Sequence, residues 1–233
     1  MRILDRIIGG SIAAAAVLAL SASTTQAQSL VNGSFEDAGG FTANPITTAT
    51  VDQGWALFNG AGSAGRSDMS ASTDAPYDGS YALLETTGPG NNWNPAGAYQ
   101  IITGLTPGQT YTFGVWALTD TTETWNQGIL VQLGFVQPSN LGAPSTVETP
   151  GGTVGINGTI PPQNTWTYYS VNATPPPGYT DAIVYLMFQD NNSAVATENM
   201  YYDAASVTAV PEPSILALLG LAVPCSFLLR RKG

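Results

Sequence analysis

Short runs of apolar residues, separated by turn residues, indicate β-strands in the central part of the chain. In the clearest run, residues 110–118, Tyr111, Phe113 and Val115 share one face. Apolar residues on both faces of residues 182–189 indicate a central, fully buried strand. The other predicted strands are residues 80–85, 98–103, 128–136, 165–171 and 200–209.

Glycine, proline and asparagine interrupt these runs at residues 104–108, 175–178 and 190–193. No long stretch of the central part keeps a helical period free of glycine and proline, so we expect no helix there. Many short strands joined by such turns are typical of a sandwich or jelly roll. The pattern therefore predicts an all-β fold, a jelly-roll β-sandwich over residues 28–210, flanked by one helix at each end.

The first 27 residues have the three-part pattern of a secretory signal peptide. Arg2 and Arg6 give the positive start, residues 12–20 are apolar, and small residues precede a suitable cleavage site after Ala27. We predict a signal-peptide helix over residues 1–27, which implies export of the rest of the chain.

Residues 214–229 contain no charge and are followed directly by a basic cluster. A helix rises about 1.5 Å per residue, so this run spans about 24 Å. That is short for a hydrocarbon core of about 30 Å. We predict a transmembrane helix in the segment 211–233, with its basic end in the cytoplasm.

The same segment resembles the PEP-CTERM sorting signal of exported bacterial proteins. Pro211, Glu212 and Pro213 precede the apolar run, and Arg230 and Arg231 follow it. The resemblance implies recognition by an exosortase-type processing protease. It also implies a protein anchored in the membrane before processing and then released to the cell surface or the extracellular matrix.

The composition excludes several classes of function. The chain has no histidine and one cysteine, which excludes histidine-dependent catalysis, an imidazole metal site and an internal disulfide. Sixteen acidic residues oppose six basic ones, and only Arg66 among the basic residues lies outside the two end segments. Residues 28–210 thus carry a formal charge of −13, which argues against a nucleic-acid partner. Gly60, Gly62 and Gly65 fit a nucleotide-loop spacing, but no βαβ unit surrounds them, so we predict a plain loop.

Several segments, in order along the chain, resemble the carbohydrate-binding-module type of galactose-binding-like jelly roll. They are the Asn32-Gly33-Ser34-Phe35-Glu36 strand, Gly54-Trp55, the strand that follows Asp78-Gly79, the hairpin from Tyr99 to Tyr111, Trp166 with Tyr168, and the closing strand at Tyr201-Tyr202-Asp203. The resemblance implies the fold and a non-catalytic carbohydrate-binding role, with an extracellular polysaccharide as partner. It does not identify a sugar.

A structural calcium ion commonly joins the first and last strands in that family. Glu36 and Asp203 fall on the matching positions, and Asp78 and the Ser80 carbonyl fall on the loop that would complete the site. Calcium binds such carboxylate and carbonyl oxygens. Ala204 stands where the family has a second acid. The alternative is that these acids are ordinary solvated surface residues.

Two tryptophans in polar segments are candidates for stacking on a sugar. Trp93 has Asn92 and Asn94 beside it, and Trp125 has Glu123 and Asn126 nearby. Aromatic faces, amides and carboxylates are the groups that recognise carbohydrates. Packing within the loops is the alternative for both. The other three tryptophans, Trp55, Trp116 and Trp166, are predicted to belong to the core.

Two other functions stay open at this point. One is a structural matrix or envelope protein with the same fold and no sugar site. The other is a glycoside hydrolase, which needs only two carboxylates. The available candidates are Glu85, Glu123, Glu148 and Glu198, and no spacing singles out a pair.

Overall fold

The computed structural model describes residues 30–42, 54–59, 63–69, 76–86, 96–119, 128–136, 151–159, 162–189 and 199–211. All of them belong to one unit, Thr25–Glu212. The predicted signal peptide and transmembrane helix lie outside the described residues. Within the described ranges, no helix is long and apolar enough to cross a membrane.

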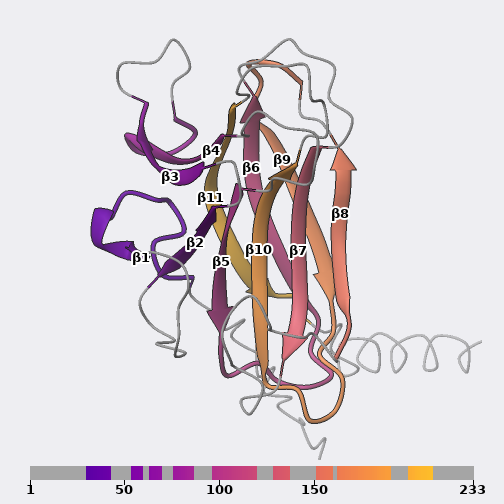
Figure 1. Ribbon diagram of the computed structural model, residues 1–233. Coiled ribbons are helices and arrows are strands. Elements are labelled where there is room, and N and C mark those ends of the chain that lie inside the picture. The colour runs from indigo at the N-terminus through magenta and orange to yellow at the C-terminus, as the bar shows by residue number, and fades with distance from the viewer. Residues whose placement is uncertain are drawn as a thin grey trace, which may run out of the picture. The chain divides into compact units, whose positions relative to one another are not determined.

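The described strands form two sheets packed face to face, as predicted for a β-sandwich (Figure 1). Sheet A has the order β1 (Phe41–Thr42), β2 (Trp55–Asn59), β5 (Ala96–Ile102), β10 (Asp181–Gln189), β7 (Gly128–Val136) and β8 (Thr153–Thr159). Sheet B has the order β3 (Ser63–Asp68), β4 (Tyr81–Thr86), β11 (Asn199–Ala209), β6 (Tyr111–Thr119) and β9 (Thr167–Ala173). The short 3-10 helix η1 (Ala38–Gly40) precedes β1. Neighbouring strands are antiparallel, apart from the parallel pair β1 and β2.

The main core lies between the sheets and follows the alternation seen in the sequence. Phe113 and Val115 of β6 and Val184 and Leu186 of β10 belong to this core, and all four are fully buried. Because successive side chains of a strand point to opposite faces, the residues between them reach the outer faces of the sheets. Trp55 also belongs to this core, as predicted.

Seven of the predicted strands are present, with bounds shifted by up to two residues. The prediction missed β1, β2, β3 and β8. The predicted loop at Gly60–Gly65 is wrong from Ser63 onwards, because β3 begins there and pairs with β4. The first predicted strand, around Asn32, is a turn instead.

Several strands begin or finish together at one end of the sandwich, which we call the Asn199 end. The last residues of β4 and β6, Thr86 and Thr119, pair with Asn199 and Met200 at the start of β11. Both threonine hydroxyls donate to Asn199, at 3.1 Å to its side-chain oxygen and 3.1 Å to its carbonyl. Gly128, the first residue of β7, pairs with the last residue of β10.

Candidate functional site

The turn at Asn32 fixes the start of the domain against both sheets. The Asn32 carbonyl accepts hydrogen bonds from the Phe35 amide at 3.1 Å and from the Trp55 indole at 3.0 Å. Its side chain binds the backbone of Asp37 through two bonds of 2.8 Å. The carbonyl of Gly33 accepts the amide of Ala205 in β11 at 2.8 Å. These contacts place Glu36 beside the loop that leads into β4.

Glu36 holds that loop through backbone amides. One of its carboxylate oxygens accepts the amides of Ser80 at 2.9 Å and Tyr81 at 2.8 Å. Gly79 lies between the carboxylate and the chain with a φ of 71°, and an added Cβ would lie 2.4 Å from the Glu36 carboxyl carbon. Only glycine fits that backbone conformation and that close approach.

Asp203 holds the same loop from β11. Its two carboxylate oxygens accept the amides of Asp78 at 2.9 Å and Ala204 at 2.6 Å. Burial raises the pKa of Asp203 to about 6, these amides oppose the rise, and the Asp78 carboxylate adds to it. Glu36 and Asp203 thus both bind backbone amides of the loop at residues 78–81, which carries Asp78 and Ser80.

Within the described ranges, no group of three or more histidine, cysteine, aspartate or glutamate side chains is arranged to hold a metal ion. The carboxylates nevertheless suit calcium in donor type, and the negative charge of Asp78 contributes to the raised pKa of Asp203. The Ser80 carbonyl already accepts the Met69 amide at 3.2 Å. The calcium assignment stays a prediction.

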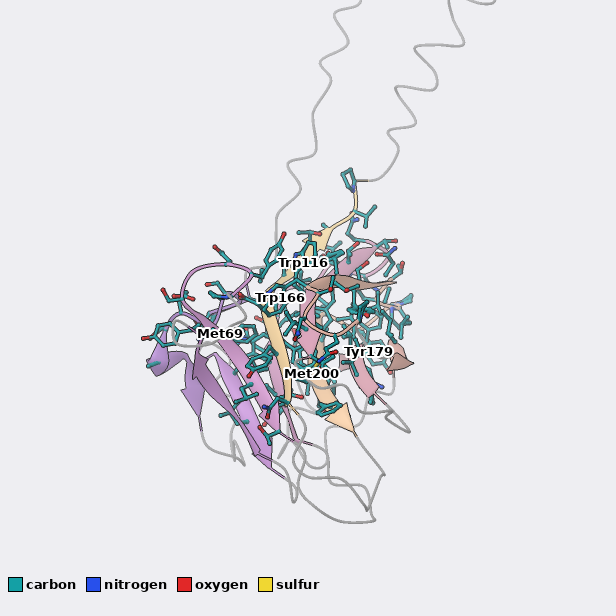
Figure 2. All side chains as sticks on the ribbon, turned by 90° about the horizontal axis from the view of Figure 1, so that it is seen from above. Met69, Trp116, Trp166, Tyr179 and Met200 are labelled. Atoms are coloured by element: carbon teal, nitrogen blue, oxygen red, sulfur yellow. The ribbon has the colours of Figure 1, made fainter. Side chains whose placement is uncertain are left out.

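An aromatic cluster that the sequence did not predict lies on the outer face of sheet B. Tyr77 stacks on Trp116 with ring centroids 4.0 Å apart and contacts Trp166 edge-on at 6.2 Å. Tyr168 also packs against Trp116, with ring centroids 5.4 Å apart. Figure 2 labels Trp116 and Trp166, which lie close together beside Met69. We call Tyr77, Trp116, Trp166 and Tyr168 the aromatic cluster.

Trp116 and Trp166 were predicted to belong to the core, but neither is fully buried or part of the main core between the sheets. Both are only partly buried, and Trp166 packs against Met69 and Leu118 on the outer side of sheet B. The sequence did contain a sign of this position, because Trp116 alternates with Phe113 and Val115 along the strand and so lies on the opposite face of the sheet. Their pairing with Tyr77 and Tyr168 depends on the register of β6 and β9, which local patterns do not encode.

The predicted sugar-contact residues lie outside the described residues. They are Trp93, Trp125, Asn92, Asn94, Glu123 and Asn126. The described strand ends on either side of them still show where the two segments begin. Segment 87–95 follows Thr86 and segment 120–127 follows Thr119, and both threonines are bonded to Asn199. Both tryptophan segments are therefore attached to the Asn199 end.

Glu85 is fully buried between the sheets at the Asn199 end, with 0% of its surface exposed. Within the described part of the chain, neither carboxylate oxygen has a hydrogen-bond partner. Burial raises the pKa of Glu85 well above its usual range, and the nearby backbone of Ala98 and Phe188 only partly opposes this. Glu85, one of the four candidate hydrolytic carboxylates, is thus not exposed at the surface. Glu123, Glu148 and Glu198 lie outside the described residues.

Most of the predicted sorting motif also lies beyond the described residues. Pro211 is the last described residue and is exposed. Glu212, Pro213, Arg230 and Arg231 follow it.

Known proteins support the fold and the class of domain. A sequence family described as a carbohydrate binding domain (CBM_4_9) matches residues 27–194. No curated protein sequence matches the chain.

Among solved structures, the enzymatically active domain of tailspike protein 4 from bacteriophage CBA120 superposes with a TM-score of 0.52 and 17% identity over 78% of this chain. This chain covers only 21% of that one. The Stig cyclase Fisc from Fischerella sp. TAU gives a TM-score of 0.53 and 13% identity, over 81% of this chain and 99% of that one. TmCBM61, solved with beta-1,4-galactotriose, gives a TM-score of 0.48 and 11% identity, over 78% of this chain and 97% of that one. The first two show a shared fold alone.

Proposed function

We propose that this chain, which belongs to the carbohydrate binding domain family, is an exported, non-catalytic protein that binds an extracellular polysaccharide. The observation that carries the proposal is the family match over residues 27–194, which covers every described strand except β11. The burial of Glu85 removes one of the candidate hydrolytic carboxylates and supports a non-catalytic role.

We place the first sugar contact at the Asn199 end. The segments that carry Trp93 and Trp125 both start from threonines bonded to Asn199. Two stacking side chains with Asn92, Asn94, Glu123 and Asn126 beside them would supply the apolar and polar contacts that hold a sugar.

The test is glycan binding by the purified full chain, kept in mild detergent, on a glycan array and in affinity electrophoresis. We expect Trp93→Ala with Trp125→Ala to weaken retention, and Val154→Ala, a 44% exposed residue of β8, to leave it unchanged. A double variant that binds as well as the wild type refutes this placement. A chain that binds no glycan refutes the function itself and favours a structural matrix role.

We also propose that the two ends of the chain direct export and sorting. The support is the three-part signal peptide of residues 1–27, and Pro211, Glu212 and Pro213 before an apolar run closed by Arg230 and Arg231. The exposed position of Pro211, directly after the last strand, suits access by a processing protease. Replacing Pro211-Glu212-Pro213 by alanines should leave unprocessed, membrane-bound protein in an exosortase-containing host. Normal release of this variant refutes the assignment.

A structural calcium ion is the last part of the proposal. Glu36, Asp78, Asp203 and the Ser80 carbonyl would hold it, and its charge would offset the repulsion between the Asp78 and Asp203 carboxylates. Its effect would be to stiffen the loop of residues 78–81.

Thermal unfolding of the full chain with calcium and with EDTA tests this. A ligand at a hundred times its Kd adds about 2.7 kcal/mol to stability, which shifts Tm by roughly 5–10 °C in a domain of this size. Asp203→Asn should abolish the difference. Identical melting curves with calcium and with EDTA refute the calcium site.

A further inference from the structure

We propose that the aromatic cluster on the outer face of sheet B is a second glycan-contact surface, and that it takes a neutral polysaccharide chain. This inference rests on the proposed carbohydrate-binding function. It concerns a different face of the domain from the predicted tryptophan site at the Asn199 end.

The two tyrosines of the cluster present large exposed rings. Tyr77 is 44% exposed and Tyr168 is 45% exposed, although each packs against Trp116. Tyr77 stacks on Trp116 and meets Trp166 edge-on, and these contacts still leave nearly half of its side chain exposed. Exposed aromatic rings that share one tryptophan neighbour offer the apolar surface on which the C–H face of a pyranose ring stacks.

The backbone of β6 is shaped to receive Tyr168. A Cβ added to Gly114 would lie 1.9 Å from the Tyr168 hydroxyl oxygen and 2.5 Å from the ring carbon that bears it. Tyr168 therefore lies over Gly114, and its ring rests on the sheet. An alanine at Gly114 must lift the ring without removing it.

The loop that carries Tyr77 is fixed before any ligand arrives. The amide of Asp78 is bonded to Asp203, and the amides of Ser80 and Tyr81 are bonded to Glu36. A surface held in its binding geometry loses less conformational entropy on association, which raises affinity.

The charge around the cluster favours an uncharged ligand. Asp203 of β11 pairs directly with Trp116 of β6, and Asp78 is exposed next to Tyr77. The described part of the chain contains one basic residue before Pro211, Arg66 of β3. Carboxylates beside the stacking rings repel an anionic polysaccharide.

The position of the cluster suits a chain of several sugars. Trp116 lies three residues before the end of β6, which is about 10 Å along a strand. The segment that carries Trp125 begins directly after that end. One extended glycan is therefore long enough to contact both the cluster and the Asn199 end.

The test uses two soluble derivatives of one backbone, neutral hydroxyethyl cellulose and anionic carboxymethyl cellulose, together with a glycan array. Affinity electrophoresis of the full chain compares Tyr77→Ala, Tyr168→Ala and Gly114→Ala with the control Val154→Ala. We expect each cluster variant to weaken binding of the best neutral glycan about five- to tenfold. Tyr77→Phe and Tyr168→Phe should keep most of the affinity, because they keep the rings. Unchanged melting temperatures show that the variants are folded.

The outcomes separate this inference from the proposed function. Glycan binding that Trp93→Ala with Trp125→Ala weakens, but that the cluster variants leave at the wild-type level, overturns the second surface alone. Stronger binding of carboxymethyl cellulose than of its neutral counterpart overturns the charge argument. A wild-type chain that binds no glycan on the array overturns the proposed function, and this surface with it.

Discussion

The buried carboxyl of Glu85 is expected to make the domain less stable as the pH rises, and Glu85→Gln should remove that loss. Glu85 lies on β4 among core residues, next to Met200 of β11 in the pairing of the two strands. Its oxygens have no hydrogen-bond partner within the described residues, and burial raises its pKa well above 4.5. A buried carboxyl without a cation is more stable in its neutral form.

The direction of the change in stability with pH follows from the number of protons that each state binds. With a raised pKa, the folded state binds more protons than the unfolded state, so the free energy of unfolding falls as the pH rises. The full contribution of the neutral carboxyl is present below a pH of about 4.5 and is lost from there up to the raised pKa of the folded state. The loss from this one group is at most about 1.4 kcal/mol per pH unit. Glutamine has the same shape and no charge at any of these pH values.

Urea unfolding at intervals between pH 4 and 8 measures the effect. The wild type should lose stability across this range, and Glu85→Gln should show a shallower slope and higher stability at pH 8. Glu85→Met provides a second neutral side chain without an amide to satisfy. The exposed Asp37, changed to asparagine, is the control for removal of a surface charge. Parallel curves for the wild type and both Glu85 variants would refute the reasoning. The slope that remains below about pH 6 should come from Asp203, whose pKa is also raised by burial.

Three further substitutions test particular contacts by urea or thermal unfolding. Tyr202→Phe removes the buried 2.7 Å bond from the hydroxyl to the Met187 carbonyl and should cost about 1–2 kcal/mol; an unchanged midpoint would contradict this. Gly79→Ala should cost about 1–3 kcal/mol, because φ is 71° and the new Cβ meets Glu36; equal stability would show that the loop relaxes freely. Ala204→Gly should add about 0.5–1 kcal/mol, because Ala204 has a φ of 47° in the bulge of β11; a lower Tm would refute the strain.

The strands that could be predicted from the sequence are those in which apolar residues form at least one complete face. Residues 128–136 were predicted with the same bounds as β7, whose side chains are almost all buried. The strands it missed include three at sheet edges, β1, β3 and β8. Of these, β3 and β8 are rich in glycine, serine, threonine and asparagine. Such edge strands are ordered by the hydrogen bonds of β4 and β7 rather than by an apolar pattern, so a periodicity argument cannot find them.

One of the two candidate sites was predictable from the sequence, and the other was not. Glu36, Asp78 and Asp203 could be placed together from the resemblance, because it orders the first and last strands in sequence. The aromatic cluster could not, since Tyr77, Trp116 and Tyr168 come from a loop and two strands up to 91 residues apart. Their meeting depends on the pairing of Trp116 with Tyr168 across β6 and β9. Cross-strand register is a property of the assembled sheet, which the hydrophobic pattern restricts only to one face or the other.

The scarcity of basic residues links the candidate calcium ligands with the aromatic cluster. The domain of residues 28–210 has Arg66 as its one side-chain cation beside 14 acidic residues. Glu36 and Asp203 bind backbone amides instead, and both bind the loop that carries Tyr77. The acids that would hold calcium therefore also hold the ring that would stack on a sugar. If both proposals are right, calcium binding and glycan affinity at the aromatic cluster must depend on each other, because each stabilises the same loop conformation.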